Sequence, residues 1–272
     1  MPSLHPVKRK TGSGTSKSGR SKYLKYLFCG IVFLLFFYPE YPKRLLYPFL
    51  FGQKYSDKLT ISTAGSYTDD TYADITIKRN NTDYILHPKT KYAITAKVGY
   101  VDKYDTFFNK LYRGHSQKDY IDLVPLDLLL VYNNMAAPDT FNMFIFKHEE
   151  RMGSVLCKGV KYKESAFSFY SSQQQVDESR KNYEKCSPNI NSAHYNNYHP
   201  IPATEKINKA LHTLLKGDIV YLEGYLVDVP QMGLVTGTRT NQHHQYISGG
   251  QNPGMCFILY TTKVITNGYI YQ

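Results

Sequence analysis

The chain has 272 residues and a formal net charge of +11, and its 40 Phe and Tyr residues include 26 Tyr, with no Trp. The charge is concentrated at the N-terminus. Residues 1–44 hold nine Lys or Arg against the single acid Glu40, a net of +8, which leaves +3 of the +11 for the rest of the chain. A nearly neutral body with a basic tail argues against a nucleic-acid-binding surface and for a tail that sets membrane topology.

An uncharged run, YLFCGIVFLLFFY, occupies residues 26–38. We predict a disordered basic cytoplasmic tail over 1–22 and a transmembrane anchor over 23–38, because Lys and Arg remain on the cytoplasmic side. The run is shorter than the roughly 20 residues of a typical span, so a cleaved signal peptide is the alternative. The motif that follows it, Pro39-Glu40-Tyr41-Pro42, lacks a small-x-small cleavage pattern and favours a retained anchor.

The topology predicts a single-pass protein of the inner (cytoplasmic) membrane, with the N-terminus in the cytoplasm and the C-terminal domain exported to the periplasm. A eukaryotic type II membrane protein would share this topology. We expect a membrane-proximal linker over 39–83 and an exported globular domain over 84–272. Within the linker, the apolar stretch 45–51 (LLYPFLF) is suited to the outer membrane interface.

Several segments of the exported part have a regular pattern. Residues 92–101 and 140–147 are predicted strands, and 125–132 (PLDLLLVY) is either a helix that begins at Pro125 or a buried strand. The polar stretch 163–191 is predicted to be a surface helix or an ordered loop.

The C-terminal third predicts a helix followed by two strands. Thr204 is the expected N-cap of the helix, whose apolar face ends before Gly217. Residues 218–229 and 256–264 are predicted strands, and Gly224 marks a bend in the first. The fold class is therefore α+β and strand-rich, an N-terminal membrane helix followed by an exported domain with an OB-like small β-barrel portion.

Three cysteines lie outside the apolar run: Cys157, Cys186 and Cys256. An oxidising compartment would allow two of them to pair. We favour Cys157 with Cys186, because this bond would close the polar stretch between them. The third thiol would stay free or pair with another chain.

The residues with candidate chemistry are few. His194 and His199 are weak candidates for a metal site, but no carboxylate or Cys stands at short spacing, so we favour a structural role in which they hydrogen-bond to the backbone and fix the loop. Asp127 is the only acid in an apolar run. It is either a helix-start residue or a buried anchor that needs a partner, such as Arg151 or Arg239. No cofactor motif is present, so we expect no cofactor and assign no metal.

Four motifs occur in order: Pro-x-Asp-Leu-x-Leu from Pro125, His-x-x-Asn-x-His-x-Ile-Pro-Ala from His194, Gly-Asp-x-Val from Gly217, and a Thr-Arg-Thr…Gly-x-Cys end from Thr238 to Cys256. Together they resemble an uncharacterised family of bacterial single-pass membrane-anchored proteins. The chain departs from the family pattern at two carboxylate positions, now Asn241 and Phe257, and by an insertion that carries His243 and His244.

These observations predict a non-enzymatic binding or assembly module of the cell envelope. Its expected partners are the inner membrane and an envelope protein, with no nucleic acid. The predicted polar network consists of Asp127, His194, Asn197, His199 and Arg239. The alternative is a His-dependent or metal-dependent envelope enzyme that uses the same residues.

Overall fold

The structure is a computed structural model that describes residues 26, 40–62, 65–68, 70–104, 118–149, 152–160, 173–236 and 256–272. The chain divides into two compact units, Met1–Lys43 and Arg44–Gln272, and the fold below is that of the second. The predicted tail and anchor lie outside the described residues, except for Tyr26. Among the residues that are described, no helix is both long and apolar enough to cross a membrane.

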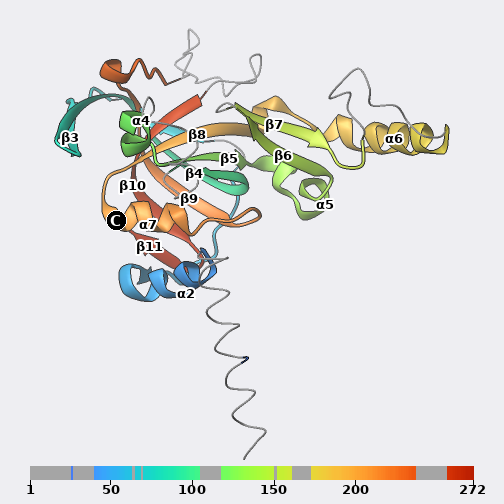
Figure 1. Ribbon diagram of the computed structural model, residues 1–272, viewed down its shortest axis with the longest axis horizontal. Coiled ribbons are helices and arrows are strands. Elements are labelled where there is room, and N and C mark those ends of the chain that lie inside the picture. The colour runs from blue at the N-terminus through green and yellow to red at the C-terminus, as the bar shows by residue number, and fades with distance from the viewer. Residues whose placement is uncertain are drawn as a thin grey trace, which may run out of the picture. The chain divides into compact units, whose positions relative to one another are not determined.

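The second unit is strand-rich α+β, as predicted (Figure 1). Its helices are α2 (Glu40–Phe51, which enters this unit at Arg44), α4 (Lys118–Leu123), α5 (Pro138–Phe141), α6 (Gln173–Cys186) and α7 (Glu205–His212). Its strands are β1 (Gln53–Lys54), β2 (Ser66–Thr68), β3 (Ile75–Arg79), β4 (Thr82–Lys103), β5 (Leu126–Val131), β6 (Phe144–Glu149), β7 (Met152–Cys157), β8 (Tyr195–Pro202), β9 (Ile219–Asp228), β10 (Cys256–Thr266) and β11 (Tyr269–Tyr271).

Nine strands form one large, mostly antiparallel sheet, and β6 and β7 form a separate hairpin. Five of the nine strands pair in a ring. β4 pairs with β5, β5 with β8, β8 with β10, β10 with β9, and β9 again with β4. The β8–β10 pair is parallel and the other four are antiparallel. This arrangement brings β5 and β8 side by side although 63 residues separate Val131 from Tyr195.

The main hydrophobic core follows from the two-residue period of the strands, because alternate side chains point to the same face. Ile94, Ala96 and Val98 of β4 and Leu128 and Leu130 of β5 are all buried in it. Tyr side chains contribute their rings to the same core.

Two of these tyrosines form a hydrogen bond with each other through their hydroxyl groups. The hydroxyl groups of Tyr92 and Tyr198 are 2.6 Å apart in the buried core, and burial raises the pKa of both well above the ordinary value. Both therefore remain neutral hydrogen-bonding groups.

The segment from Pro125 is a strand rather than a helix, and all six residues of β5 are buried. Its second face is covered by the β6–β7 hairpin, where Leu129 and Val131 join a cluster with Phe144 and Phe146. The approach is close, because a Cβ at Gly153 would lie 2.4 Å from a Leu129 methyl group. A strand that is covered on both faces has a continuous apolar run as its sequence, which explains why the pattern did not distinguish it from a helix.

Three sequence expectations differ from the structure. The expected linker is part of the folded unit, since β1 pairs with β11 and both β2 and β3 pair with β4. Short strands at sheet edges have little periodicity, so their sequence resembles a linker. The strand expected over 140–147 begins only at Phe144, because Pro138 starts a short helix.

The third difference concerns α7. Its N-cap is Thr204 as expected, with the hydroxyl accepting from the Ile207 amide at 3.3 Å, but the helix ends at His212 rather than near Gly217. Gly217 instead adopts a φ of +93° in the turn that leads into β9. Within β9, Gly224 allows close strand contact, because a Cβ there would lie 1.9 Å from the Tyr260 carbonyl oxygen.

Candidate functional site

Asp127, the second residue of the otherwise apolar strand β5, is fully buried and hydrogen-bonded. One carboxylate oxygen contacts Nδ1 of His199, and the other accepts a hydrogen bond from the Tyr104 hydroxyl. Nε2 of His148 lies 3.4 Å from that second oxygen. The acid is therefore a buried anchor with imidazole and phenol partners, and the arginine partners considered from the sequence lie outside the described residues.

Strand register brings the acid and the imidazole together. β5 and β8 are antiparallel, with Leu128 opposite Tyr198 and Leu129 opposite Asn197, so the next pair in this register is Asp127 and His199. Residues opposite each other in a sheet point to the same face. The polar pair therefore lies on the face of β5 away from the main core, the same face that the β6–β7 hairpin covers.

Further side chains complete the cluster. The Tyr120 hydroxyl is 3.2 Å from His199 Nδ1, the Asn197 amide nitrogen is 3.4 Å from His199 Nε2, and Nδ1 of His148 is 3.3 Å from the Asp102 carboxylate. We call this cluster the buried polar network, and its members are Asp102, Tyr104, Tyr120, Asp127, His148, Asn197 and His199. They come from the end of β4 and the residue after it, from α4, and from β5, β6 and β8.

Burial governs the electrostatics of the network. The His199 side chain is 4% exposed, the His148 side chain 1%, and the Asp127 side chain not at all. Burial, followed by the adjacent Asp127 carboxylate, raises the pKa of Tyr104 far above its ordinary value, so this phenol is a permanent donor. Nδ1 of His199 faces the Asp127 carboxylate, and Nε2 of the same ring faces the Asn197 side-chain amide.

A carboxylate that orients an imidazole is the arrangement used in general acid–base catalysis. Here both partners are enclosed, and the imidazole contacts a carboxylate, a phenol and an amide. Side chains from separate segments of the chain meet at one carboxylate. These contacts have a direct structural effect, because Tyr120 holds α4 and His148 holds the β6–β7 hairpin against the sheet.

His194 lies in a different setting. It ends a short 3-10 turn, Ser192–His194, where its Nδ1 is 2.6 Å from the Asn134 side-chain oxygen and its Nε2 3.0 Å from the Asn133 amide. Partial burial lowers the pKa of His194 below its ordinary value. Of the five residues proposed from sequence, the structure brings together Asp127, Asn197 and His199, places His194 among asparagines, and does not describe Arg239.

Sequence reasoning missed four members of the network: Asp102, Tyr104, Tyr120 and His148. One signal was available for His148, because Phe144, Phe146 and His148 alternate along β6 and so share a face. Tyr120 carries no such signal, since it comes from a six-residue helix.

The structure gives no metal centre in the part of the chain that it describes, where no group of three or more His, Cys, Asp or Glu is arranged to hold a metal ion. The two histidines suggested as metal ligands, His194 and His199, contact different partners.

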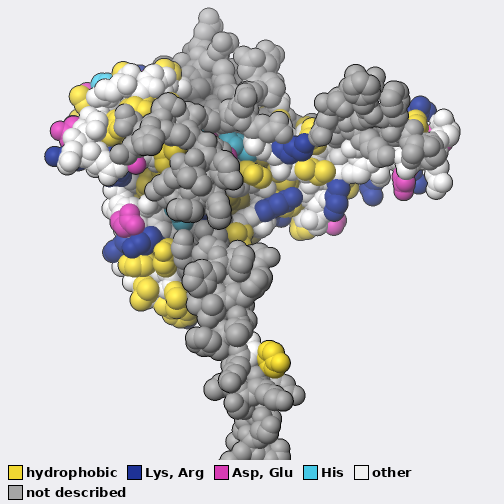
Figure 2. Space-filling view, viewed as in Figure 1, with side chains coloured by type: hydrophobic (Ala, Val, Ile, Leu, Met, Phe, Trp, Pro, Cys, Tyr) yellow, Lys and Arg dark blue, Asp and Glu magenta, His cyan; other side chains and the backbone are white. Residues whose placement is uncertain are grey.

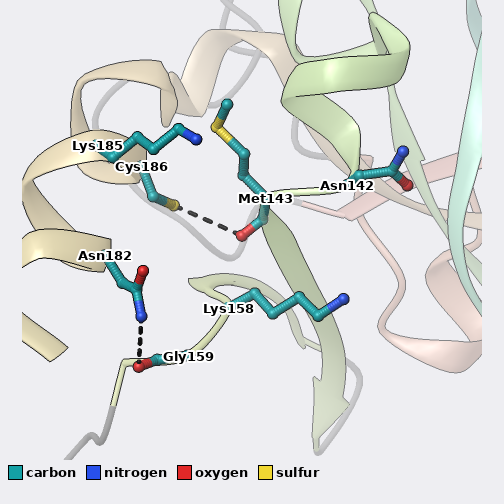
Figure 3. Close-up of a pocket in the computed structure, with 7 residues that line it drawn as sticks. All are labelled: Asn142, Met143, Lys158, Gly159, Asn182, Lys185 and Cys186. Carbon is teal, nitrogen blue, oxygen red and sulfur yellow. Dashed lines mark hydrogen bonds between the residues drawn. The ribbon is translucent and has the colours of Figure 1, made fainter. Parts of the chain in front are cut away.

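Cys157 and Cys186, the pair favoured from the sequence, form a disulfide that joins β7 to the end of α6. A pocket of about 300 Å³ lies beside it, and Figure 3 shows the residues that line it: Asn142, Met143, Lys158, Gly159, Asn182, Lys185 and Cys186. Asn182 donates to the Gly159 carbonyl at 3.2 Å across this pocket. None of these residues belongs to the buried polar network.

Comparison with protein-family models, curated proteins and solved structures finds no match for this chain. The class that the fold and the site define is therefore a strand-rich α+β domain with a ring of five paired strands and a buried acid–imidazole network on one sheet face.

Proposed function

We propose that this protein is a non-enzymatic binding or assembly module of the cell envelope, anchored in the inner membrane by residues 23–38. The N-terminus is in the cytoplasm and the folded domain in the periplasm. Two observations support this location and topology. The basic residues precede the uncharged run 26–38, and a disulfide joins Cys157 to Cys186, as is usual for exported proteins.

We further propose that the ring of β4, β5, β8, β10 and β9 is an OB-type barrel. A closed cycle of five paired strands, with α7 between its third and fourth strands in chain order, supports this assignment. OB-type domains bind oligonucleotides and oligosaccharides over their second and third strands. The corresponding strands here are β5 and β8.

The observation that carries the non-enzymatic proposal is the burial of Asp127 and His199 on those two strands, beneath the chain's own α4 and β6–β7 hairpin. The usual ligand face is thus occupied by intramolecular contacts, and the net charge of +3 outside residues 1–44 offers little attraction to nucleic acid. A protein partner, bound at another surface, fits these observations best.

The test is capture of the full-length protein from its native membrane in mild detergent, with crosslinking and mass spectrometry. The proposal expects a stoichiometric envelope protein that also co-purifies with an Asp139→Ala variant, a change at an exposed site outside the network. A wild-type sample that captures no stoichiometric partner would contradict an assembly role.

The alternative is a His-dependent or metal-dependent envelope enzyme, and the direct contact between Asp127 and His199 favours the His-dependent form. Metal analysis of the purified protein tests the metal-dependent form of this alternative. A bound transition metal that His199→Ala and His194→Ala both remove would favour the enzyme. Unchanged metal content with a lowered melting temperature in His199→Ala would favour the structural network.

A further inference from the structure

Helix α2 is attached to the folded domain along one side. Arg44 forms a 2.6 Å ion pair with Asp218, at the turn before β9, and Pro48 is buried. The ammonium group of Lys209 in α7 lies 4.1 Å from the centroid of the Phe51 ring. These contacts hold residues 44–51 in a fixed orientation on the domain.

The other side of α2 is apolar and exposed. Leu45, Leu46, Phe49 and Leu50 have 69%, 58%, 78% and 67% of their surface exposed. Their spacing, two adjacent residues followed by two more one turn later, places them on one face. Figure 2 shows hydrophobic side chains gathered over the region that Figure 1 labels α2.

We propose that this face of α2 is a membrane-interface surface, which lies in the headgroup and upper acyl region of the same bilayer that holds the anchor. The inference rests on the anchored topology proposed above. It adds that the domain is seated on the membrane in one orientation, with the side formed by α2, β1, β11 and α7 against the lipid.

Chain length determines the occupant of this surface. The uncharged run ends at Tyr38 and α2 begins at Glu40, so one residue separates them. One residue spans at most about 3.6 Å, so a helix that follows a membrane span this closely starts within the interfacial region.

The composition of the helix is also suited to that position. Helices that lie in a membrane interface carry Phe and Leu on the face that enters the lipid, and the exposed face of α2 consists of Leu45, Leu46, Phe49 and Leu50. Lys54, in the strand β1 that follows the helix, is exposed, and anionic headgroups attract cations near the membrane surface. Unlike a free amphipathic helix, α2 has its other face packed on protein, so membrane contact also fixes the domain.

The experiment uses the absence of Trp from this chain. Phe49→Trp places the one Trp of the chain on the proposed surface, where it can be excited selectively over Tyr, and Tyr183→Trp, at a half-exposed position on α6, provides the matched control. Each full-length variant is reconstituted into phosphatidylethanolamine–phosphatidylglycerol vesicles, with and without lipids brominated on the acyl chains.

We expect the emission of the Phe49→Trp variant to be blue-shifted and quenched at least threefold more strongly by brominated lipid than that of the Tyr183→Trp variant. Aqueous iodide should preferentially quench the Tyr183→Trp variant. Equal iodide quenching of the two variants would overturn the inference. A blue shift in Phe49→Trp without bromolipid quenching, which grows with the protein-to-lipid ratio, would also overturn it and assign the surface to a second copy of the chain.

Alkaline carbonate extraction of the same vesicles separates this inference from the proposed anchoring. A Phe49→Trp protein that resists extraction while its indole is exposed to water would leave the anchor in place and refute only the interfacial helix. Protein released by carbonate would refute the anchor, and the interfacial helix with it.

Discussion

The two histidines of the stretch 194–199 are five residues apart and have opposite environments. His199 lies in β8, almost fully buried, against the Asp127 carboxylate, whereas His194 lies in the preceding turn, against the side chains of Asn133 and Asn134. A strand that is covered on both faces removes water from its polar side chains, so each of them needs a protein partner. In a turn, water can supply part of the hydrogen bonding, and amide partners suffice.

The strongest test of this contrast is removal of the carboxylate on which the buried network converges. Asp127→Ala leaves His199 and Tyr104 without the carboxylate that both contact and removes the carboxylate 3.4 Å from His148, so we expect the free energy of unfolding to fall by about 3–5 kcal/mol. Urea denaturation of the full-length protein in mild detergent measures it. Asp57→Ala, at an exposed acid, is the control and should change it by less than about 0.5 kcal/mol. If Asp127→Ala lowered the free energy of unfolding by no more than the Asp57→Ala control, the network would contribute no stability.

The disulfide fastens the chain just before the His194 turn, since Cys186 precedes the turn by six residues. The paired change Cys157→Ser and Cys186→Ser should lower the free energy of unfolding by about 2–4 kcal/mol, because the bond closes a loop with a sequence separation of 29. Histidine NMR should show a changed environment for His194 and an unchanged one for His199. The opposite pattern would show that the disulfide supports the buried network instead.

A double-mutant cycle compares the two histidines directly. Asp127→Ala combined with His199→Ala should show a coupling energy of about 1–3 kcal/mol, because the two side chains are in contact. The same acid combined with His194→Ala should be additive to within about 0.5 kcal/mol. Denaturation of the single and double variants and the wild type measures both. Similar coupling for both histidines would refute their separation into two environments.

The smallest expected effect is a pH dependence from His194. Partial burial lowers its folded-state pKa below the ordinary 6.5, so the unfolded chain binds the proton more readily. Stability from this group is complete above about pH 6.5 and is lost as the pH falls from that value through the folded-state pKa. NMR titration should place the His194 midpoint below 6.5, and His194→Gln should remove this component of the pH dependence. A midpoint above that ordinary value would contradict the burial of this ring.

Part of the fold could be predicted from sequence, because the hydrophobic periodicity of a segment and the capping residue at its end indicate the same element. Thr204 begins α7 as expected, and the strands β4, β9 and β10 follow from their apolar patterns. The edge strands β1 to β3 could not be recognised, since backbone pairing with β4 and β11 holds them in place. The predicted anchor lies outside the described residues and remains a prediction.

For the site, sequence reasoning singled out Asp127 because an acid in an apolar run needs a partner, and His199 and Asn197 because they lie in one polar motif. It did not identify which partner the acid has. Tyr104, Tyr120 and His148 are brought to it by the β4–β5 register, by α4 and by the β6–β7 hairpin. The alternation along β6 indicates which face His148 shares with Phe144 and Phe146, but no pattern in the sequence indicates that these three side chains meet Asp127.

The sequence by itself determined the charge asymmetry, the uncharged run, the capped helix and the main strands, because these depend on residues that are near each other in the chain. Only the tertiary structure decided that His199 rather than His194 meets Asp127, and that α2 has one face packed and one exposed. Both outcomes depend on strand register and on the packing of distant segments, where the free energy of burying a polar or apolar group is set by neighbours far along the chain.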